Sequence, residues 1–179
     1  MSLDSKIQPG TNANGKRIKL LTLAFLFSEG RDQILLGKKK RGFGEGWWNG
    51  FGGKVVDGET IVEGAKREVL EECSLNASSL TKRGIIDFEF VNDPVILQVH
   101  IFEIIKFSGQ PLESEEMLPK WFNVNQIPFD NMWPDDKMWF PYLIEKKYFE
   151  GYILFEGHTK VLDCKLVLKH DGQDDNSAE

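Results

Sequence analysis

Residues 52–72 read GGKVVDGETIVEGAKREVLEE, and this stretch combines a glycine-rich loop with a helix that ends in carboxylates. Thr60 followed by Glu63 is a capping box, which marks the first turn of a helix. Apolar residues then recur at the spacing of one helical face: Val62, Ala65 and Val69. The sequence therefore predicts a helix over about residues 60–73, reached through a loop that contains the glycines.

Three glutamates crowd the last turns of this predicted helix, at positions 68, 71 and 72. At 100° per residue they fall within an arc of about 100° on the helix surface. Such close like charges repel one another, and the negative end of the helix dipole disfavours them further. A hard divalent cation would relieve both effects, because Mg²⁺ prefers carboxylate and water oxygens. The competing interpretation is a solvated acidic surface, which is the usual meaning of a charge run.

Two neighbouring features favour a binding site over a plain acidic surface. Arg67 lies four residues from both Glu63 and Glu71, so it can brace the acidic face without being a metal ligand. Gly52 and Gly53 carry no side chains, and the backbone there can approach a phosphate or a metal closely. Neither feature by itself names a reaction.

Short strand-like runs dominate the rest of the chain, and turn-forming residues separate them. The expected strands span residues 20–27, 33–37, 85–91, 95–106, 121–124, 152–155 and 161–168. A second helix is expected over residues 136–147, where Pro141 should cause a kink or a late start. Many strands with two helices predict an α+β domain rather than a doubly wound α/β domain.

Length, composition and charge fit one globular domain, because the 179 residues include 41% hydrophobic and 28% charged positions. We expect a disordered lead over residues 1–17, one domain over 18–169 and an acidic disordered tail over 170–179. The net charge of −6 argues against nucleic acid as a direct partner, and no apolar run reaches the roughly 18 residues of a membrane helix. Two isolated cysteines and the lack of a secretory signal predict a cytoplasmic protein, with a mitochondrial or nuclear fraction left open.

The acidic helix and its loop resemble the Nudix box, G-x5-E-x7-R-E-U-x-E-E-x-G-U, in which U is a bulky aliphatic residue. Eight of its nine defined positions match: Gly53, Glu59, Arg67, Glu68, Val69, Glu71, Glu72 and Leu75. Ser74 replaces the glycine that would cap the helix, where a positive φ should cost serine on the order of 1 kcal/mol. The resemblance implies the Nudix fold, a mixed β-sheet sandwiched between helices.

The flanking segments resemble the animal MutT-homologue branch of this family, which comprises oxidised purine nucleoside triphosphate hydrolases. The resemblance rests on KKRGFGEGWWNGFGGKV at 39–55, FEFV at 88–91 and QIPFDNMWPDD at 126–136, and it extends roughly from Leu20 to Leu168. It implies hydrolysis of modified purine triphosphates, of the 8-oxo-dGTP and 2-hydroxy-dATP type, to the monophosphate and pyrophosphate. Such an enzyme would sanitise the nucleotide pool and so protect DNA indirectly.

The resemblance also implies a site for Mg²⁺, with Mn²⁺ as a substitute, on the acidic helix. The implied catalytic residues are Arg67, Glu68, Glu71 and Glu72, and the implied metal ligands are these three glutamates, the Gly52 carbonyl and the distal Glu116. Glu68 and Glu72, four residues apart on the helix, are the strongest candidates. The metal would orient the phosphates and lower the pKa of bound water. Which carboxylate removes the proton stays open.

A separate base site is expected around Trp133, Asp135 and Asp136. The tryptophan offers a stacking face for a purine, and the carboxyl groups offer hydrogen bonds to its edge. If both carboxyl groups are buried and close, one should hold a proton at neutral pH, because like charges resist joint ionisation. A protonated aspartic acid donates and an ionised one accepts, so the pair could read two different base edges. Asn49, with both donors and an acceptor, should complete the recognition.

Further residues of the base site come from the resemblance alone: Phe43, Phe88, Trp139 and Thr22 as lining, with Lys39 at the rim. Each of these features has a structural alternative. Asp135 can be a helix N-cap, the aromatic residues can be core, and residues 38–41 can be a solvated basic turn. The combined match to one branch favours the functional interpretation.

Two competing functions stay open. One is a Nudix hydrolase for another substrate, such as a dinucleotide, a diphosphoinositol or a nucleotide sugar, which would need the helix carboxylates but not Asn49 with the aspartate pair. The other is a nucleotide-binding Nudix protein without catalysis, although such proteins usually lose box glutamates and all are present here. A structural interaction domain is the weakest alternative, since no repeat or docking motif is visible. A small-molecule nucleotide is the expected partner, and a monomer the expected assembly.

Overall fold

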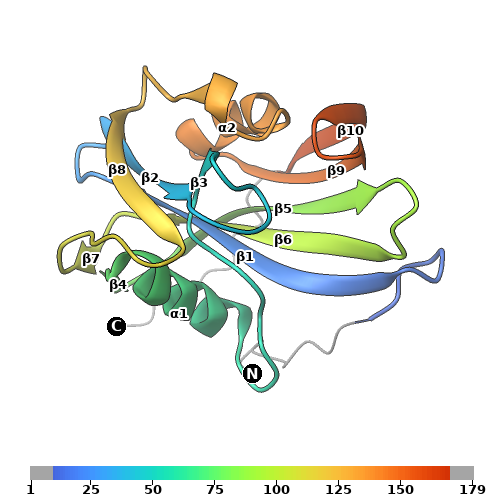
Figure 1. The fold of residues 1–179 in the computed structure, drawn as a ribbon, viewed down its shortest axis with the longest axis horizontal. Coiled ribbons are helices and arrows are strands. Elements are labelled where there is room, and N and C mark those ends of the chain that lie inside the picture. The colour runs from blue at the N-terminus through green and yellow to red at the C-terminus, as the bar shows by residue number, and fades with distance from the viewer. Residues whose placement is uncertain (1–9, 170–179) are drawn as a thin grey trace.

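The computed structural model describes residues 10–169, and it contains a mixed sheet between two α-helices (Figure 1). The helices are α1 (Ile61–Cys73) and α2 (Asp136–Ile144), and a short 3-10 helix, η1 (Phe129–Asn131), precedes α2. The strands are β1 (Arg17–Phe27), β2 (Gln33–Lys39), β3 (Trp48–Asn49), β4 (Asn76–Ala77), β5 (Thr81–Phe90), β6 (Val95–Ile104), β7 (Phe107–Ser108), β8 (Met117–Asn123), β9 (Tyr148–Glu156) and β10 (Lys160–Lys169). The expected mixed sheet sandwiched between helices is confirmed.

The main sheet has the strand order β10-β9-β5-β6-β1-β2-β3, with β8 paired to β2, while β4 and β7 form a separate ribbon. The pairs β1–β6 and β5–β9 are parallel, and the other pairs are antiparallel. The hairpin expected between the first two strands is present as the β1–β2 pair. Because two pairs are parallel, chain segments far apart in sequence meet at the centre of the sheet.

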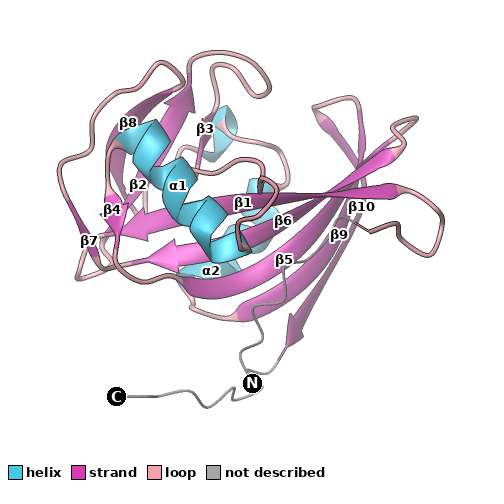
Figure 2. Ribbon diagram, turned by 90° about the horizontal axis from the view of Figure 1, so that it is seen from below, coloured by secondary structure: helices cyan, strands magenta, loops and turns pink. Residues whose placement is uncertain are grey.

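The two helices cover opposite faces of the sheet (Figures 1 and 2). Alternation along β1 explains this arrangement, because successive side chains of a strand point to opposite faces. Ala24 and Leu26 belong to the core cluster that includes α1, whereas Phe25 and Phe27 belong to the cluster that includes α2. The protein therefore has two apolar cores that share one sheet, and each core anchors one helix.

The caps of α1 agree with the sequence prediction. The Glu63 amide donates to Thr60 Oγ1 at 3.2 Å, and the Thr60 amide donates to Glu63 Oε2 at 2.7 Å, which completes the capping box. Ser74 ends the helix in the left-handed conformation with φ 62°. Serine pays the steric cost of that conformation that glycine would avoid.

Several predicted boundaries differ from the structure. β1 starts three residues earlier than expected, at Arg17, and β5 starts four residues earlier, at Thr81. Half-exposed polar residues occupy these strand ends, so pairing with a neighbouring strand extends them without an apolar signal. The second helix ends at Ile144 rather than 147, because Lys146 takes φ 59° and turns the chain into β9.

Residues 10–17, the described part of the expected disordered lead, make local contacts. The Asn12 side chain accepts hydrogen bonds from the Asn14 and Lys16 amides, and Thr11 forms a β-bridge with Arg17. Lys16 also pairs with Glu89 of β5 at 2.5 Å. Residues 1–9 of the expected lead and the whole expected tail, 170–179, lie outside the described residues. Within residues 10–169, no helix combines the length and apolar character needed to cross a membrane.

Candidate active site

Two cavities adjoin on the structure. The larger has a volume of about 800 Å³, and all nine residues predicted to bind substrate line it: Thr22, Lys39, Phe43, Asn49, Phe88, Trp133, Asp135, Asp136 and Trp139. The smaller, which we call the acidic cavity, is lined by Gly52, Glu68, Glu71, Glu72 and Glu116, the five predicted metal ligands, among others. Lys39, Gly52, Gly53 and Glu72 line both cavities. A molecule that fills both would lie across this shared wall.

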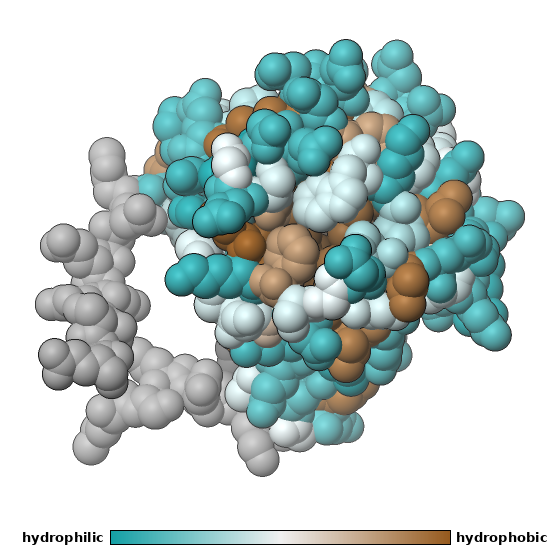
Figure 3. Space-filling view, turned by 90° about the vertical axis from the view of Figure 1, so that its left-hand side faces the viewer, coloured by the Kyte–Doolittle hydropathy of each residue, from teal (hydrophilic) through white to brown (hydrophobic). Residues whose placement is uncertain are grey.

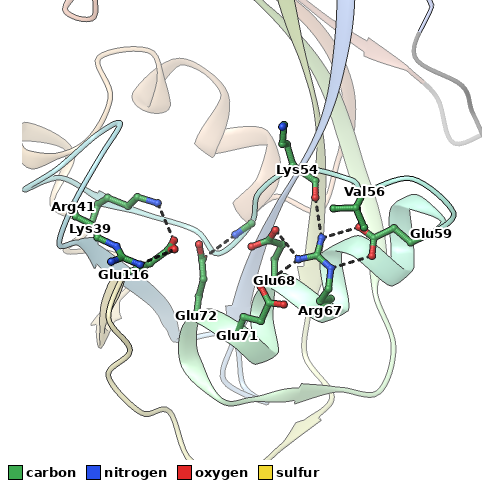
Figure 4. Close-up of polar contacts among 11 residues, drawn as sticks. Lys39, Arg41, Lys54, Val56, Glu59, Arg67, Glu68, Glu71, Glu72 and Glu116 are labelled. Carbon is green, nitrogen blue, oxygen red and sulfur yellow. Dashed lines mark hydrogen bonds and ion pairs between the residues drawn. The ribbon is translucent and has the colours of Figure 1, made fainter.

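Glu72 and Glu68 differ from ordinary surface carboxylates (Figure 4). Glu72 is only 4% exposed, and its Oε2 accepts a hydrogen bond from the Gly52 amide at 3.1 Å. Burial raises the pKa of Glu72 to about 8, and repulsion from Glu68 and Glu116 adds to the effect. Burial likewise raises the pKa of the half-buried Glu68. Glu71 is exposed, so only Glu68 and Glu72 among the three helix glutamates are shielded from water.

Arg67 holds the glycine-rich loop against α1. Its guanidinium donates to both oxygens of Glu59, at 3.0 and 2.7 Å, and to the Lys54 carbonyl at 2.9 Å. It also donates to Glu68 at 2.9 Å and to Glu71 at 3.3 Å. The hydrogen bond to Glu59 is the main reason that the pKa of Arg67 is raised. The same hydrogen bond is the main reason that the pKa of Glu59 is lowered.

Glu63, four residues before Arg67, turns its carboxylate back to the Thr60 amide. Glu59 takes its place, since the loop folds back alongside the helix. Arg67 lines neither cavity. Its geometry is that of a residue that orients carboxylates rather than one that contacts a ligand.

The glycine pair is required by the close approach of the protein's own groups. A Cβ atom at Gly53 would lie 2.6 Å from the Glu68 carboxyl group, and one at Gly52 would lie 1.9 Å from the Thr22 carbonyl oxygen. Thr22 itself donates its amide to the Gly53 carbonyl at 2.9 Å. The Gly52 carbonyl accepts no hydrogen bond from residues 10–169, so it remains available as a ligand.

The carboxylate oxygens of the acidic residues suit a hard cation, although the residues are not arranged as a complete coordination site. Within residues 10–169, no group of three His, Cys, Asp or Glu side chains is arranged to hold a metal ion as it stands. Positively charged side chains pair with the carboxylates instead. Arg67 bonds Glu68 and Glu71, and Glu116 pairs with Lys39 at 3.6 Å and with Arg41 at 3.4 Å (Figure 4). The oxygens that face the acidic cavity are the type that Mg²⁺ prefers.

Asp135 and Asp136, which line only the larger of the two cavities, are both 2% exposed. The Trp139 indole donates to Asp135 Oδ2 at 2.9 Å, whereas Asp136 Oδ2 has no partner among the described residues. Burial raises the pKa of Asp135 to about 6. Burial and then repulsion from Asp135 raise the pKa of Asp136 well above its usual value. A buried carboxyl group without a partner is costly, so a ligand that bonds to Asp136 would remove an existing penalty.

The alternative that Asp135 caps α2 is wrong, because its side chain makes no capping hydrogen bond and turns to Trp139 instead. Trp139 is 1% exposed and packs edge to face on Phe25 with ring centroids 5.8 Å apart. It is therefore a core residue that also lines the cavity. Its burial agrees with the structural interpretation, and its place in the cavity wall is compatible with the functional one.

An aromatic group forms the mouth of the larger cavity. Phe43 is 55% exposed, and its ring lies 4.7 Å from that of Trp133 and 4.9 Å from that of His158. Sequence reasoning missed Phe90 and His158, which also line the cavity. The alternation that placed Phe90 on the same strand face as Phe88 could have identified it. His158 gave no such signal, because only the folding of the β9–β10 turn brings it there.

The NUDIX domain family model matches residues 19–143. The chain belongs to the Nudix family of hydrolases, as the box predicted. It is 51% identical over 148 residues to the oxidized purine nucleoside triphosphate hydrolase of Danio rerio, covering 83% of this chain and 94% of that protein. The same named protein of Mus musculus is 52% identical with the same coverage. The solved MutT protein of Bacillus halodurans shares the fold, with a TM-score of 0.74 at 24% identity over 83% of this chain and 97% of that one.

Proposed function

We propose that this protein hydrolyses oxidised purine nucleoside triphosphates, of the 8-oxo-dGTP and 2-hydroxy-dATP type, to the monophosphate and pyrophosphate, and that it requires Mg²⁺. The observation that carries the proposal is the buried Asp135–Asp136 pair in a cavity that adjoins the carboxylates of α1. A nucleotide has the matching layout, with a polar base edge at one end and phosphates at the other. The names of the two curated relatives support the same substrate class.

At the base end, the two aspartates differ in protonation. Burial and repulsion from Asp135 raise the pKa of Asp136 and so favour its protonated form, and its Oδ2, which has no partner among the described residues, can bond a ligand. Asp135 carries the charge, which the Trp139 N–H group stabilises. The pair therefore presents one donor and one acceptor to a purine edge. A shift of the proton between them would accommodate a second edge pattern, and Asn49 adds an amide nearby.

At the phosphate end, Glu68, Glu71, Glu72, Glu116 and the Gly52 carbonyl would hold the metal. When bound, Mg²⁺ would orient phosphate oxygens and lower the pKa of the attacking water. Lys39 lines both cavities, so its ammonium group can bind a phosphate oxygen of a nucleotide that spans them. Arg67 keeps Glu68 in position, and a cation bound here would favour the ionised form of Glu72, whose pKa burial raises in its absence.

The test is pyrophosphate release from 8-oxo-dGTP and from dGTP, with and without Mg²⁺. We expect a strong preference for 8-oxo-dGTP that Asp135→Asn reduces, and turnover that Glu72→Gln lowers by about 10²–10⁴-fold on both substrates. Glu63→Gln is the matched control on α1, because glutamine at this position preserves the capping box. Metal-dependent release without a base preference would refute the proposed substrate class. No release from any nucleotide would refute the proposed hydrolytic activity.

We also propose that the protein acts as a monomer on free nucleotides in the cytoplasm, without direct contact with nucleic acid. On the face shown in Figure 3, apolar side chains form small groups among hydrophilic ones, which supports a surface that stays in water. The net charge of −6 supports the exclusion of nucleic acid. Sedimentation of the full chain at several concentrations, with and without duplex DNA, tests both statements.

A further inference from the structure

A buried ion cluster lies at the end of α2 that is remote from the two aspartates. Glu103 of β6 is 2% exposed and pairs with Arg83 of β5 at 2.5 Å and with Arg31 of the β1–β2 turn. One carboxylate thus bonds two guanidinium groups. Glu103, Arg31 and Arg83 line neither cavity, so no part of the proposed chemistry accounts for them.

Two local irregularities bring the arginines to Glu103. The β5–β6 register shifts between Lys82 and Gly84, which makes Arg83 the extra residue of a β-bulge. Thr81 pairs with Glu103, so Arg83, two residues further along β5, lies on the same sheet face, and the bulge leaves it outside the strand register. Arg31 takes φ 58° in its turn, and its guanidinium lies 4.2 Å above the Phe27 ring. A bulge in β5 and a turn between β1 and β2 thus bring two arginine side chains to one carboxylate.

The cluster bonds to the C-terminal end of α2. Arg31 Nη2 donates to the Ile144 carbonyl at 3.2 Å and more weakly to the Leu143 carbonyl at 3.4 Å, and Arg83 Nη1 donates to the Lys146 carbonyl at 2.9 Å. The last turn of α2 has no basic residue of its own. Arg31 and Arg83 therefore supply the positive charge that the negative end of a helix favours, and Arg31 bonds the Ile144 carbonyl, one of those that the helix leaves open.

We propose that Glu103, Arg31 and Arg83 form a positioning cluster for base recognition, which fixes α2 along its axis and thereby sets the place of Asp135 and Asp136. α2 has nine residues, begins with Asp136 and carries Trp139, the partner of Asp135. Apolar packing holds the helix on the sheet but is non-directional, so it resists sliding poorly. The hydrogen bonds from the cluster are directional and supply that restraint. The inference rests on the proposed function, because it needs the aspartates to contact the base.

The test uses Glu103→Gln, which leaves the two guanidinium groups without their shared charge, and Arg83→Lys, which keeps the charge. Binding of 8-oxo-dGMP and of dGMP, KM and kcat for 8-oxo-dGTP, and hydrogen exchange of the amides of residues 140–146 are measured. We expect Glu103→Gln to raise Kd and KM for the oxidised base about tenfold, to change kcat less than twofold and to speed exchange in α2. Arg83→Lys should retain part of the affinity.

Ile104→Val is the matched control, because Ile104 is the next residue on β6 and packs in the other core, with α1. It should lower stability and leave the affinity for 8-oxo-dGMP unchanged. Equal losses of affinity in Glu103→Gln and Ile104→Val at matched thermal stability would overturn the proposal, as would faster exchange in α2 with wild-type affinity. Failure of the proposed function looks different, because the wild-type protein would then bind 8-oxo-dGMP and dGMP alike.

Discussion

The protein contains two groups of crowded carboxylates, and the repulsion within each group is relieved in a different way. On α1, Glu68 and Glu72 lie beside a cavity, with protein cations close to the acidic group. At the start of α2, Asp135 and Asp136 are more deeply buried, and no cation pairs with them among the described residues. The first group can remain charged if a metal replaces its cations, whereas burial in the second favours a protonated carboxyl group.

Under the proposed function, this difference assigns a separate task to each group. A charged, cation-exchanging group suits phosphates and metal, and a neutralised, rigid group suits the recognition of hydrogen-bond donors and acceptors on a base. The same side-chain chemistry thus serves two roles because burial and neighbouring cations differ. Changes that alter only one of these environments should separate turnover from base preference.

The largest effect on the α1 group is expected from Arg67→Gln. Loss of the hydrogen bonds to Glu59 and Glu68 frees the loop and disorders the carboxylates, which should lower kcat by about 10- to 100-fold. The preference for 8-oxo-dGTP over dGTP should stay the same, and more Mg²⁺ should be needed for half-maximal rate. Steady-state kinetics at varied Mg²⁺ measure this, with Lys66→Gln as the control. A changed base preference would break the proposed separation.

Asp136→Asn should show that the α2 group holds a proton. The pKa of Asp136 is raised in the folded state from its ordinary 3.8, so the stabilisation by the neutral form is complete below that value and is lost as pH rises towards the folded-state pKa. Asparagine cannot ionise, so the stability of the variant relative to the wild type should increase as the pH rises above 3.8.

Urea denaturation at pH 4.5, 6 and 7.5 measures the gain of Asp136→Asn. The exposed Asp130, in the segment just before α2, gives the control variant Asp130→Asn. A stability difference that does not vary with pH would mean that Asp136 is ionised in the folded protein. The division between a charged and a neutralised group would then be wrong.

Trp139→Phe should weaken base recognition by a smaller amount. It removes the hydrogen bond to Asp135 and keeps most of the buried ring, so kcat/KM for 8-oxo-dGTP should fall about fivefold, or about 1 kcal/mol. The bond favours charged Asp135, so its loss should also raise the pKa of that carboxyl group and move the pH profile of KM upwards. Trp121→Phe, which lies outside both cavities, is the control. An unchanged pH profile would contradict the role of the indole.

Ser74→Gly should have the smallest effect and no influence on either group. Glycine adopts φ 62° without steric cost, so the free energy of unfolding should rise by about 0.5–1 kcal/mol while kcat and base preference stay at wild-type values. Urea denaturation checks the gain. Ser79→Gly, at a position without positive φ, should give none. A change in kcat would link the cap to the carboxylates of α1.

Local patterns predicted the α1 side of the molecule well, because its caps and spacing depend on neighbours in sequence. The exception is Glu59, which bonds Arg67 only after the loop folds back. On the α2 side, resemblance supplied residues that line the larger cavity, whereas spacing alone left Asp135 and Trp139 ambiguous. Glu103 was hidden inside an expected strand, since its arginine partners lie 72 and 20 residues away in sequence. Contacts of that range depend on sheet pairing, which periodicity does not encode.

The bare backbone at Gly52 and Gly53 restricts how this protein could evolve. A side chain at either position would collide with β1 or with Glu68, and both residues belong to the wall that the two cavities share. Mutational paths to a new substrate are therefore closed at the centre of the site. They remain open at the mouth, where Phe43 is 55% exposed and His158 sits on a turn. Adaptation to other bases should accumulate at that rim while the wall stays fixed.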